Sequence, residues 1–158
     1  MTDLDLVDLK LEDFKKFDFN GTCCPCKIID IYDGDTCIAG IKWNNQYIQI
    51  RLRLKGINSA EMKPPKNIEN RDSIIENAYL AKKKLIEYCT EESPENCKSK
   101  KECEEIMKKN KKIIYVKMYH FDTFGRVISE LYLDPEYNQS INKLMVDNGY
   151  AIKFDKYE

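Results

Sequence analysis

Residues 50–61 read IRLRLKGINSAE, and the rest of the chain is organised around this stretch. Apolar and basic side chains alternate over residues 50–55, which is the period-two pattern of a strand with one buried face. The polar turn after this strand brings Asn58, Ser59 and Glu61 into close succession. The stretch therefore predicts a strand that leads directly into a cluster of oxygen-bearing groups.

Two further polar turns lie on either side of this stretch. Residues 33–36 read DGDT, and residues 122–126 read DTFGR. Acidic oxygens suit a hard divalent cation. The guanidinium groups of Arg53 and Arg126 suit a phosphate, because the planar fork matches two phosphate oxygens. A metal, two arginines and a free carboxylate are the parts needed to hydrolyse a phosphodiester bond.

Composition limits the classes of protein to which the chain can belong. Its 158 residues predict one domain, and its net charge of −1 provides no global attraction for nucleic acid, so such a site must be a local patch. The sequence shows no signal-peptide layout and no run of membrane-spanning length. Seven cysteines, an odd number, then favour a reduced, intracellular protein. We expect a monomer without a membrane partner.

Hydrophobic periodicity predicts strands followed by helices. Asp-Gly between apolar runs is a strong hairpin signal, and Ser73 and Glu76 are spaced as a helix-capping box. Strands are predicted over residues 27–32, 36–43, 46–55, 113–121 and 127–133, and helices over 73–89, 99–109 and around 141–145, the last ended by Gly149. This order predicts an α+β fold whose five-stranded antiparallel sheet closes as a small barrel.

The domain organisation predicted from these patterns has two parts. Residues 1–26 form an N-terminal extension, and residues 27–158 form the main domain, with a highly charged insertion at residues 91–110. Apolar residues at the beginning of the extension fit either a helix or a strand. We predict a short amphipathic segment that packs on the domain.

The motifs, taken in order, resemble the staphylococcal nuclease (thermonuclease) family. The resemblance covers about residues 27–151 and rests on DGDT at 33–36, RLKGINSAE at 53–61, DTFGR at 122–126 and an Asn-containing helix that ends at Gly149. It implies an OB-type barrel with two to three helices. It also implies a metal-dependent endonuclease, a hydrolase that uses calcium to cleave DNA and RNA with little sequence preference.

The resemblance also assigns roles to individual residues. It implies that calcium is bound by Asp35, Asn58 and the backbone carbonyl of Ser59, with Asp33 supporting these ligands from behind. Glu61 would position or deprotonate the attacking water. The remaining assignments are Arg53 and Arg126 as phosphate-binding, charge-stabilising groups, and Lys63, Lys66 and Phe124 as possible contacts to the nucleic acid.

Departures from the family pattern leave alternatives open. Asn58 replaces the second acidic ligand, Ala60 replaces a proline, and Phe124 replaces a tyrosine. An amide oxygen binds calcium without contributing charge, so we expect weaker metal binding. Mg²⁺ and Mn²⁺ are alternatives to Ca²⁺, and a catalytically weakened module that binds nucleic acid or protein is the alternative to an enzyme.

The cysteines permit a further alternative, a structural zinc site. Cys23, Cys24 and Cys26 lie close together and could combine with Cys89, Cys97 and Cys103. Cys23 and Cys26 have the C-x₂-C spacing, but the second closely spaced pair typical of structural zinc sites is missing. Buried or free thiols are the preferred interpretation.

Overall fold

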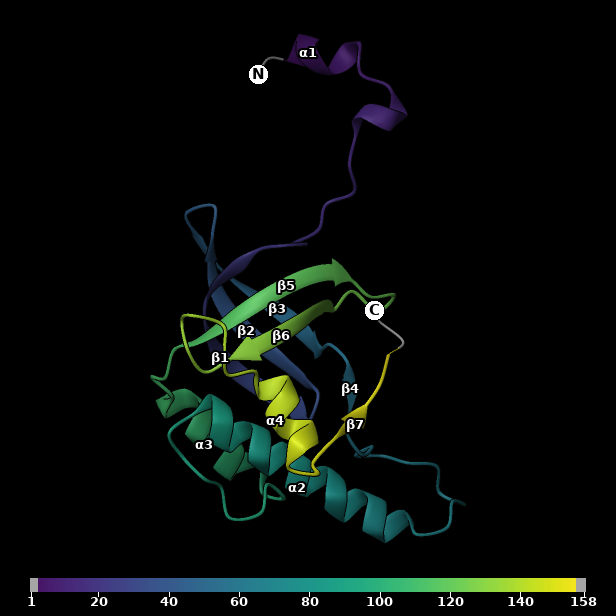
Figure 1. Ribbon diagram of the computed structural model, residues 1–158, viewed down its shortest axis with the longest axis vertical. Helices are drawn as coiled ribbons and strands as arrows, with labels where there is room; N and C mark the ends of the chain where they lie inside the picture. Colours follow the sequence, from purple (N-terminus) through teal and green to yellow (C-terminus); the bar gives the residue numbers. More distant parts are fainter. Residues whose placement is uncertain (1–2, 156–158) are drawn as a thin grey trace.

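Five strands close into a barrel in the order β1-β2-β3-β6-β5 (Figure 1). The computed structural model describes residues 3–155. The strands are β1 Cys23–Asp33, β2 Thr36–Trp43, β3 Gln46–Leu54, β5 Ile114–Phe121 and β6 Val127–Tyr132. The predicted α+β fold with a five-stranded OB-type barrel is confirmed.

A parallel pair of strands closes the barrel. β3 and β6 run in the same direction, with Leu52 opposite Val127 and Arg53 opposite Ile128. The other neighbouring pairs are antiparallel. The prediction of an entirely antiparallel sheet is therefore wrong at this pair, and the barrel is mixed. Hairpin signals reveal only local antiparallel pairs, whereas a parallel pair needs a long crossover connection.

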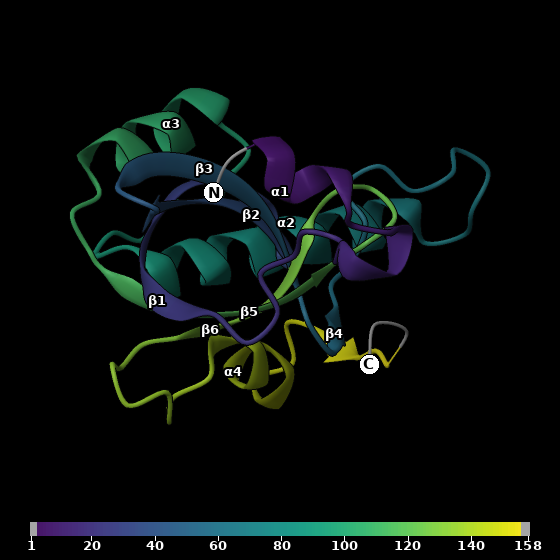
Figure 2. The ribbon, with the colours of Figure 1, turned by 90° about the horizontal axis from the view of Figure 1, so that it is seen from above.

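Three helices surround the lower part of the barrel. They are α2 Arg71–Cys89, α3 Lys100–Lys109 and α4 Ile141–Asp147. α2 lies across one end of the barrel, and α4 lies beside β6 (Figures 1 and 2). The fully buried stripe of α2 contains Ala78, Ala81 and Leu85, at the spacing expected for a helix that packs on one face. α2 thereby seals the end of the apolar barrel interior.

The helix ends agree with the sequence prediction to different degrees. Ser99 caps α3 by accepting a hydrogen bond from the Glu102 backbone N–H. α2 starts at Arg71, two residues before the predicted start, with Asn70 in the left-handed conformation at φ 61° and without a side-chain cap. The capping box predicted at Ser73 is therefore wrong, because Ser73 already lies inside the helix.

A second, smaller sheet lies beside the barrel. It pairs β4, Ile57–Asn58, with β7, Ile152–Lys153, in antiparallel register. Sequence periodicity cannot reveal strands of this length. The pairing ties the C-terminal end of the described chain to the turn after β3, since the Phe154 N–H also bonds to the Gly56 carbonyl at 2.9 Å.

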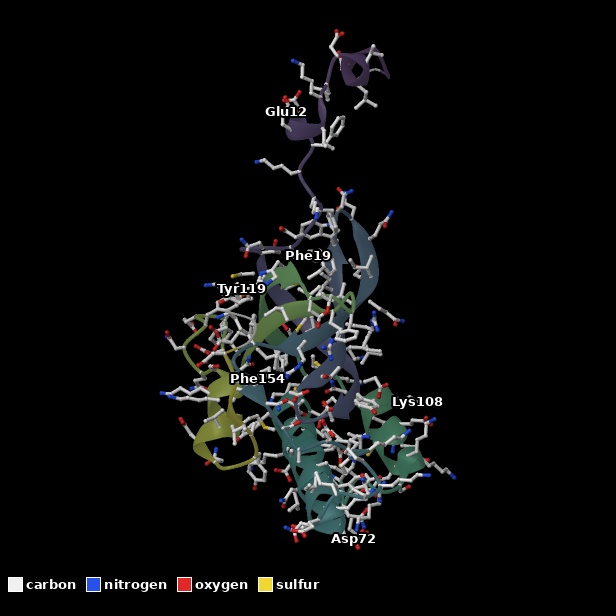
Figure 3. All side chains as sticks on the ribbon, turned by 90° about the vertical axis from the view of Figure 1, so that its right-hand side faces the viewer. Glu12, Phe19, Asp72, Lys108, Tyr119 and Phe154 are labelled. Atoms are coloured by element: carbon white, nitrogen blue, oxygen red, sulfur yellow. The ribbon has the colours of Figure 1, made fainter. Side chains whose placement is uncertain are left out.

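The N-terminal segment projects away from the barrel (Figure 1). It contains α1, Asp3–Val7, and a 3₁₀ turn, Leu11–Asp13. Its large apolar residues are exposed, among them Phe14 at 52% and Leu11 at 87%. Figure 3 shows Glu12 on this segment, far above the barrel, whereas Phe19 lies at the top of the barrel. The predicted packing of the amphipathic segment on the domain is therefore wrong for residues 6–14.

The chain packs on the barrel from Phe19 onward. Phe19 is 4% exposed, and its ring contacts the rings of Phe17, Trp43 and Phe121 at centroid distances of 5.0–5.8 Å. The division into residues 1–26 and 27–158, with an insertion at 91–110, stays a prediction. Within residues 3–155, no helix is both long and apolar enough to cross a membrane.

Candidate active site

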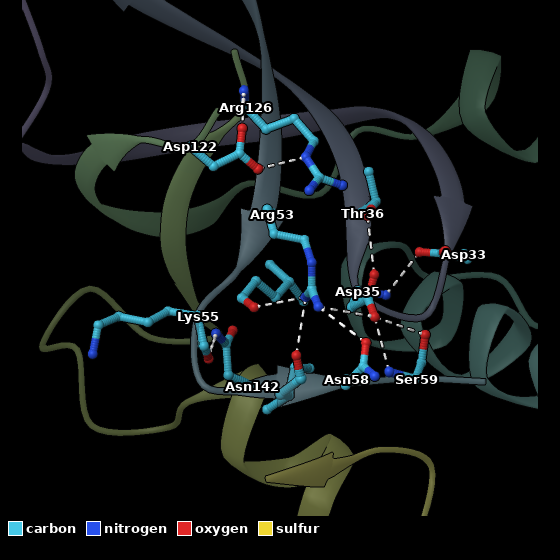
Figure 4. Close-up of polar contacts among 12 residues, drawn as sticks. Asp33, Asp35, Thr36, Arg53, Lys55, Asn58, Ser59, Asp122, Arg126 and Asn142 are labelled. Carbon is cyan, nitrogen blue, oxygen red and sulfur yellow. Dashed lines mark hydrogen bonds and ion pairs between the residues drawn. The ribbon is translucent and has the colours of Figure 1, made fainter. Parts of the chain in front are cut away.

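The carboxylate of Asp35 is held in the turn between β1 and β2 and is 5% exposed. Its Oδ2 accepts hydrogen bonds from the Ser59 backbone N–H at 2.8 Å and from the Ser59 hydroxyl at 3.1 Å. Its Oδ1 accepts a hydrogen bond from the Thr36 hydroxyl at 3.0 Å. These bonds, drawn in Figure 4, join the turn to the loop that follows β4.

Gly34 allows the turn to approach this loop closely. A Cβ atom at this position would lie 2.7 Å from the Cβ of Ala81 on α2 and 2.8 Å from the Cβ of Ser59. Any larger residue must push apart the turn, the helix and the loop. The glycine of the Asp-Gly-Asp motif is thus required for packing as well as for the hairpin.

The guanidinium of Arg53 is buried next to Asp35, with 4% of the residue exposed. Its Nη1 donates to the backbone carbonyls of Leu54 and Ile57, both at 3.0 Å. Its Nη2 donates to Asn58 Oδ1 at 3.1 Å and lies 3.5 Å from Asp35 Oδ2. Thr36 lies opposite Arg53 in the β2–β3 ladder, so hairpin register brings the arginine to the aspartate. The buried cation is thus balanced by one carboxylate and several carbonyl oxygens.

Asp33 lies behind Asp35 and supports it. Its Oδ1 accepts a hydrogen bond from the Asp35 backbone N–H at 3.1 Å. Burial, reinforced by repulsion from the Asp35 carboxylate, raises the pKa of Asp33 to about 7. The site therefore concentrates more negative charge than two neighbouring carboxyls readily carry, and a cation placed there would relieve this repulsion.

The turn between β5 and β6 holds the second arginine. Asp122 Oδ2 accepts a hydrogen bond from Arg126 Nε at 2.7 Å. Its Oδ1 accepts hydrogen bonds from the backbone N–H groups of Phe124 and Arg126, both at 2.9 Å. The guanidinium carbon of Arg126 lies 5.2 Å from the centre of the Phe124 ring. The side chain is thus fixed at one edge, and 20% of it stays exposed.

The parallel pairing of β3 with β6, residues 52–54 with 127–129, is called the parallel seam below. It brings the two arginines to the same part of the barrel (Figure 4). Arg53 pairs with Ile128 and its neighbour Leu52 with Val127, so Arg126 precedes the seam by one residue. Asn142 on α4 braces this region from behind. Its Nδ2 donates to the carbonyls of Lys55 and Ser129, and its Oδ1 accepts from the Leu131 N–H.

Comparison with known families agrees with this geometry. A family model described as staphylococcal nuclease homologue matches residues 51–158. The chain belongs to the staphylococcal nuclease family. No curated protein matches the chain. The matched region begins at Arg51 and therefore leaves out the Asp33–Asp35 turn. Asp35 nevertheless contacts Arg53 and Ser59, which both lie inside the matched region.

Glu61 follows the bonded cluster by two residues. It is exposed, in the loop after Ser59, and makes no hydrogen bond or ion pair with another described residue. Lys63 and Lys66 are exposed on the same loop. Of the residues predicted from the family resemblance, the structure therefore brings Asp33, Asp35, Arg53, Asn58 and Ser59 into one network and leaves Glu61 outside it.

Sequence reasoning missed several residues that position this site. Thr36 and Asp122 appear in the predicted motifs, yet their bonds to Asp35 and Arg126 were not foreseen. Arg51 is exposed on β3, and its Nη2 donates to the Phe124 carbonyl at 2.7 Å, a bond that strand alternation alone does not reveal. An acid and a base four residues apart across a Gly-containing turn was the available signal for the Asp122–Arg126 pair.

The atoms at the site that could act as metal ligands are all oxygens. Asp35 and Asp33 supply carboxyl oxygens and Asn58 supplies an amide oxygen, a set that fits a hard divalent cation such as calcium. Among the described residues, no three His, Cys, Asp or Glu side chains gather as a metal cluster. With Asn58 in place of an acid, the cation would meet fewer charged ligands. The set fits a weakly held metal.

The cysteines are all free thiols. Burial raises the pKa of Cys26, Cys37 and Cys89, so these thiols hold their protons at neutral pH. Zinc binds the thiolate rather than the thiol. Their environment is therefore that of core side chains.

Proposed function

We propose that this protein is a metal-dependent nuclease that hydrolyses phosphodiester bonds in DNA and RNA with low sequence specificity. The observation that carries the proposal is the single network in which Arg53 contacts Asp35 and Asn58, and Asp35 in turn contacts Ser59, with Arg126 across the adjoining seam. Carboxylate and amide oxygens beside two arginines suit a divalent cation and a phosphate held next to each other.

The division of labour follows from the chemistry of these groups. A calcium ion, held by Asp35, Asn58 and the Ser59 carbonyl, would supply positive charge beside the phosphate. Arg126 has its outer nitrogens available to a phosphate, because only its Nε is held by Asp122. Arg53 offers Nη2 once the substrate competes with Asn58 for it. Together the two arginines stabilise the charge that builds up on the phosphate oxygens in the transition state.

Glu61 is the proposed base. It has no partner among the described residues, so its carboxylate stays available to orient water and accept its proton. Water then attacks phosphorus and the bond to the 5′-oxygen breaks, leaving a 3′-phosphate, as the family resemblance implies. We further propose that Lys63, Lys66 and Phe124 contact the nucleic acid and that the protein acts as a monomer.

A second candidate function follows from Asn58. Its amide oxygen is already engaged by Arg53, and it brings no charge to a cation. A site with such weak metal binding could serve a non-catalytic module that binds nucleic acid or protein. The free carboxylate of Glu61 favours the enzyme, because a binding module for an anion has no use for it.

The proposal is tested by measuring cleavage of labelled single-stranded DNA and RNA in the presence of calcium, magnesium, manganese or a chelator. Glu61→Gln should lower turnover by about 100-fold or more while the fold and binding stay unchanged, because the side chain makes no intramolecular bond. Glu69→Gln, an exposed acid on the same loop, is the matched control and should cleave normally. Arg53→Ala, checked by circular dichroism, should also abolish cleavage.

Each alternative has its own outcome in this experiment. Equal turnover in Glu61→Gln and wild type would remove Glu61 from the mechanism. Salt-sensitive binding without cleavage under any ion condition would establish the binding module instead. The absence of both cleavage and nucleic-acid binding would reject the nuclease and the nucleic-acid-binding module, and would direct the search to a protein partner.

A further inference from the structure

A large open cavity lies between the outer face of β1–β3 and the two helices α2 and α3. Its volume is about 1230 Å³. We name it the lysine groove. The floor is apolar, with Ile29, Ile41 and Ile48 from the strands and Met107 from α3. α3 forms one wall, so this part of the predicted insertion at residues 91–110 creates the groove.

The rim of the groove is strongly basic although the whole chain carries a net charge of −1. Seven lysines line the groove, against only two acids, Asp30 and Glu104. Two of the lysines, Lys98 and Lys100, have carboxylate partners at 2.9 Å and 3.9 Å. The other five have no carboxylate within 4.0 Å among the described residues; they are Lys27, Lys42, Lys63, Lys82 and Lys108. Figure 3 labels Lys108 on α3.

Exposed aromatic rings accompany these lysines. Tyr47 is 85% exposed and Tyr32 is 56% exposed, and both line the groove. Lys42 Nζ lies 6.0 Å from the centre of the Tyr47 ring, so a lysine and a ring of the groove are neighbours. Aromatic rings along a basic track are the usual means of binding single-stranded nucleic acid, because bases stack on the rings while lysines follow the phosphates.

One end of the groove meets the candidate active site. Tyr32 directly precedes Asp33, and the lining residues Met62 and Lys63 directly follow Glu61. Two chain segments that carry site residues thus also line the groove, which places this end of the groove next to the site. This continuity favours a nucleic acid over an acidic peptide as the occupant.

We infer that the lysine groove binds the single-stranded nucleic acid that continues from the scissile phosphate, between the barrel and α3. The inference extends the proposed function and rests on it only for the position of the cleaved bond. Binding in the groove needs neither metal nor catalysis, so the two can be tested separately.

The test measures binding of a fluorescein-labelled 12-nucleotide oligo(dT) by anisotropy in chelator, over a range of salt concentrations. The groove variant carries Lys27→Ala, Lys82→Ala and Lys108→Ala. The control variant carries Lys101→Ala, Lys111→Ala and Lys143→Ala, which removes the same charge from exposed lysines outside the groove.

The groove variant should bind at least about tenfold more weakly than the control at 0.1 M salt. Its plot of log affinity against log salt should be shallower by about 2, because each phosphate contact on a single strand contributes about 0.7. Tyr47→Ala should weaken binding by about fivefold or more through lost stacking. Hydrolysis of a dinucleotide, too short to reach the groove, should be unchanged in the groove variant.

Equal affinities and salt slopes in the two triple variants would overturn the inference. Equally tight binding of a labelled 12-residue polyglutamate would also overturn it, since the groove would then be a general anion surface. If no substrate is cleaved but the binding difference appears, the proposed nuclease activity fails while the groove assignment stands.

Discussion

At the scale of single residues, Asn58 is the position at which the proposed cation site differs in charge from the family pattern. Its Oδ1 accepts a hydrogen bond from Arg53, an arrangement that an aspartate could keep as an ion pair. A carboxylate 4 Å from a divalent ion contributes about 2 kcal/mol even at the dielectric constant of water. The amide gives up this attraction, so metal affinity should rise when a carboxylate replaces it.

The substitution Asn58→Asp should tighten calcium binding by about tenfold or more, as measured by isothermal titration calorimetry. The reason is the added charge next to Asp35. Asn67→Asp, which adds the same charge on the exposed loop, is the control and should leave the affinity unchanged. An unchanged affinity in Asn58→Asp would mean that residue 58 is not a calcium ligand.

The same scale shows which parts of the site could be predicted. Asp35, Arg53, Asn58 and Ser59 are neighbours through one hairpin and one turn, so short-range motifs predicted their proximity. The bond from Asp122 to Arg126 depends on side-chain geometry within a turn, which residue types alone do not specify. The raised pKa of Asp33 likewise depends on burial that only the closed fold creates.

At the scale of elements, the turn between β5 and β6 is organised by one carboxylate. Burial alone would raise the pKa of Asp122, but hydrogen bonds from Arg126 and Phe124, with the nearby guanidinium charge, hold it below its ordinary value. A carboxyl group whose pKa is lower in the folded state stabilises the fold above its unfolded pKa of about 3.9. That stabilisation is lost as the pH falls through the lower folded value.

The substitution Asp122→Asn should therefore lower the free energy of unfolding at pH 7 by about 1–2 kcal/mol, through weakened charged hydrogen bonds. Urea denaturation at a series of pH values should show this difference from wild type narrowing as the pH falls below about 4. Asp147→Asn, at an exposed position, should cause no comparable change. A difference that is independent of pH would show that the charge of Asp122 is not what stabilises the turn.

Elements also differ in how well the sequence predicted them. β2 was predicted at Thr36–Trp43 and observed there, because both of its ends are polar turns. β4 and β7, of two residues each, carry no periodicity. The start of α2 was placed at a capping box, whereas the helix begins at Arg71 after Asn70 adopts a positive φ, a choice that tertiary packing decides.

At the scale of the whole molecule, Phe19 marks the boundary between two parts of the chain. The described residues before it form a projecting segment, called the arm, and those from Phe19 onward form the packed domain. From Phe19 onward the chain contributes to the apolar core, whereas residues 5–18 expose their side chains. The amphipathic pattern of the first twenty residues was real, but pattern alone does not tell whether a segment packs on its own domain. The arm should therefore contribute little to stability.

Two phenylalanine variants test this division by urea denaturation. Phe19→Ala should lower the free energy of unfolding by about 3 kcal/mol, because it removes a buried ring that contacts Trp43 and Phe121. Phe14→Ala, at a position 52% exposed, should change it by less than about 0.5 kcal/mol. A large loss of stability in Phe14→Ala would show that the arm packs on the barrel in solution.

The parallel seam between β3 and β6 also bears on how the chain folds. The β2–β3 hairpin brings Arg53 to the turn that carries Asp35, and this contact is local. The seam must join Leu52 to Val127, about 75 residues away along the chain, and closing so long a loop costs more entropy than forming a hairpin. Arg126 comes to the same part of the barrel as Arg53 only when this pair of strands forms. Under the proposed function, a chain still emerging from the ribosome, or one that has opened at the seam, would hold only half of the phosphate site and would not cut the nucleic acid around it.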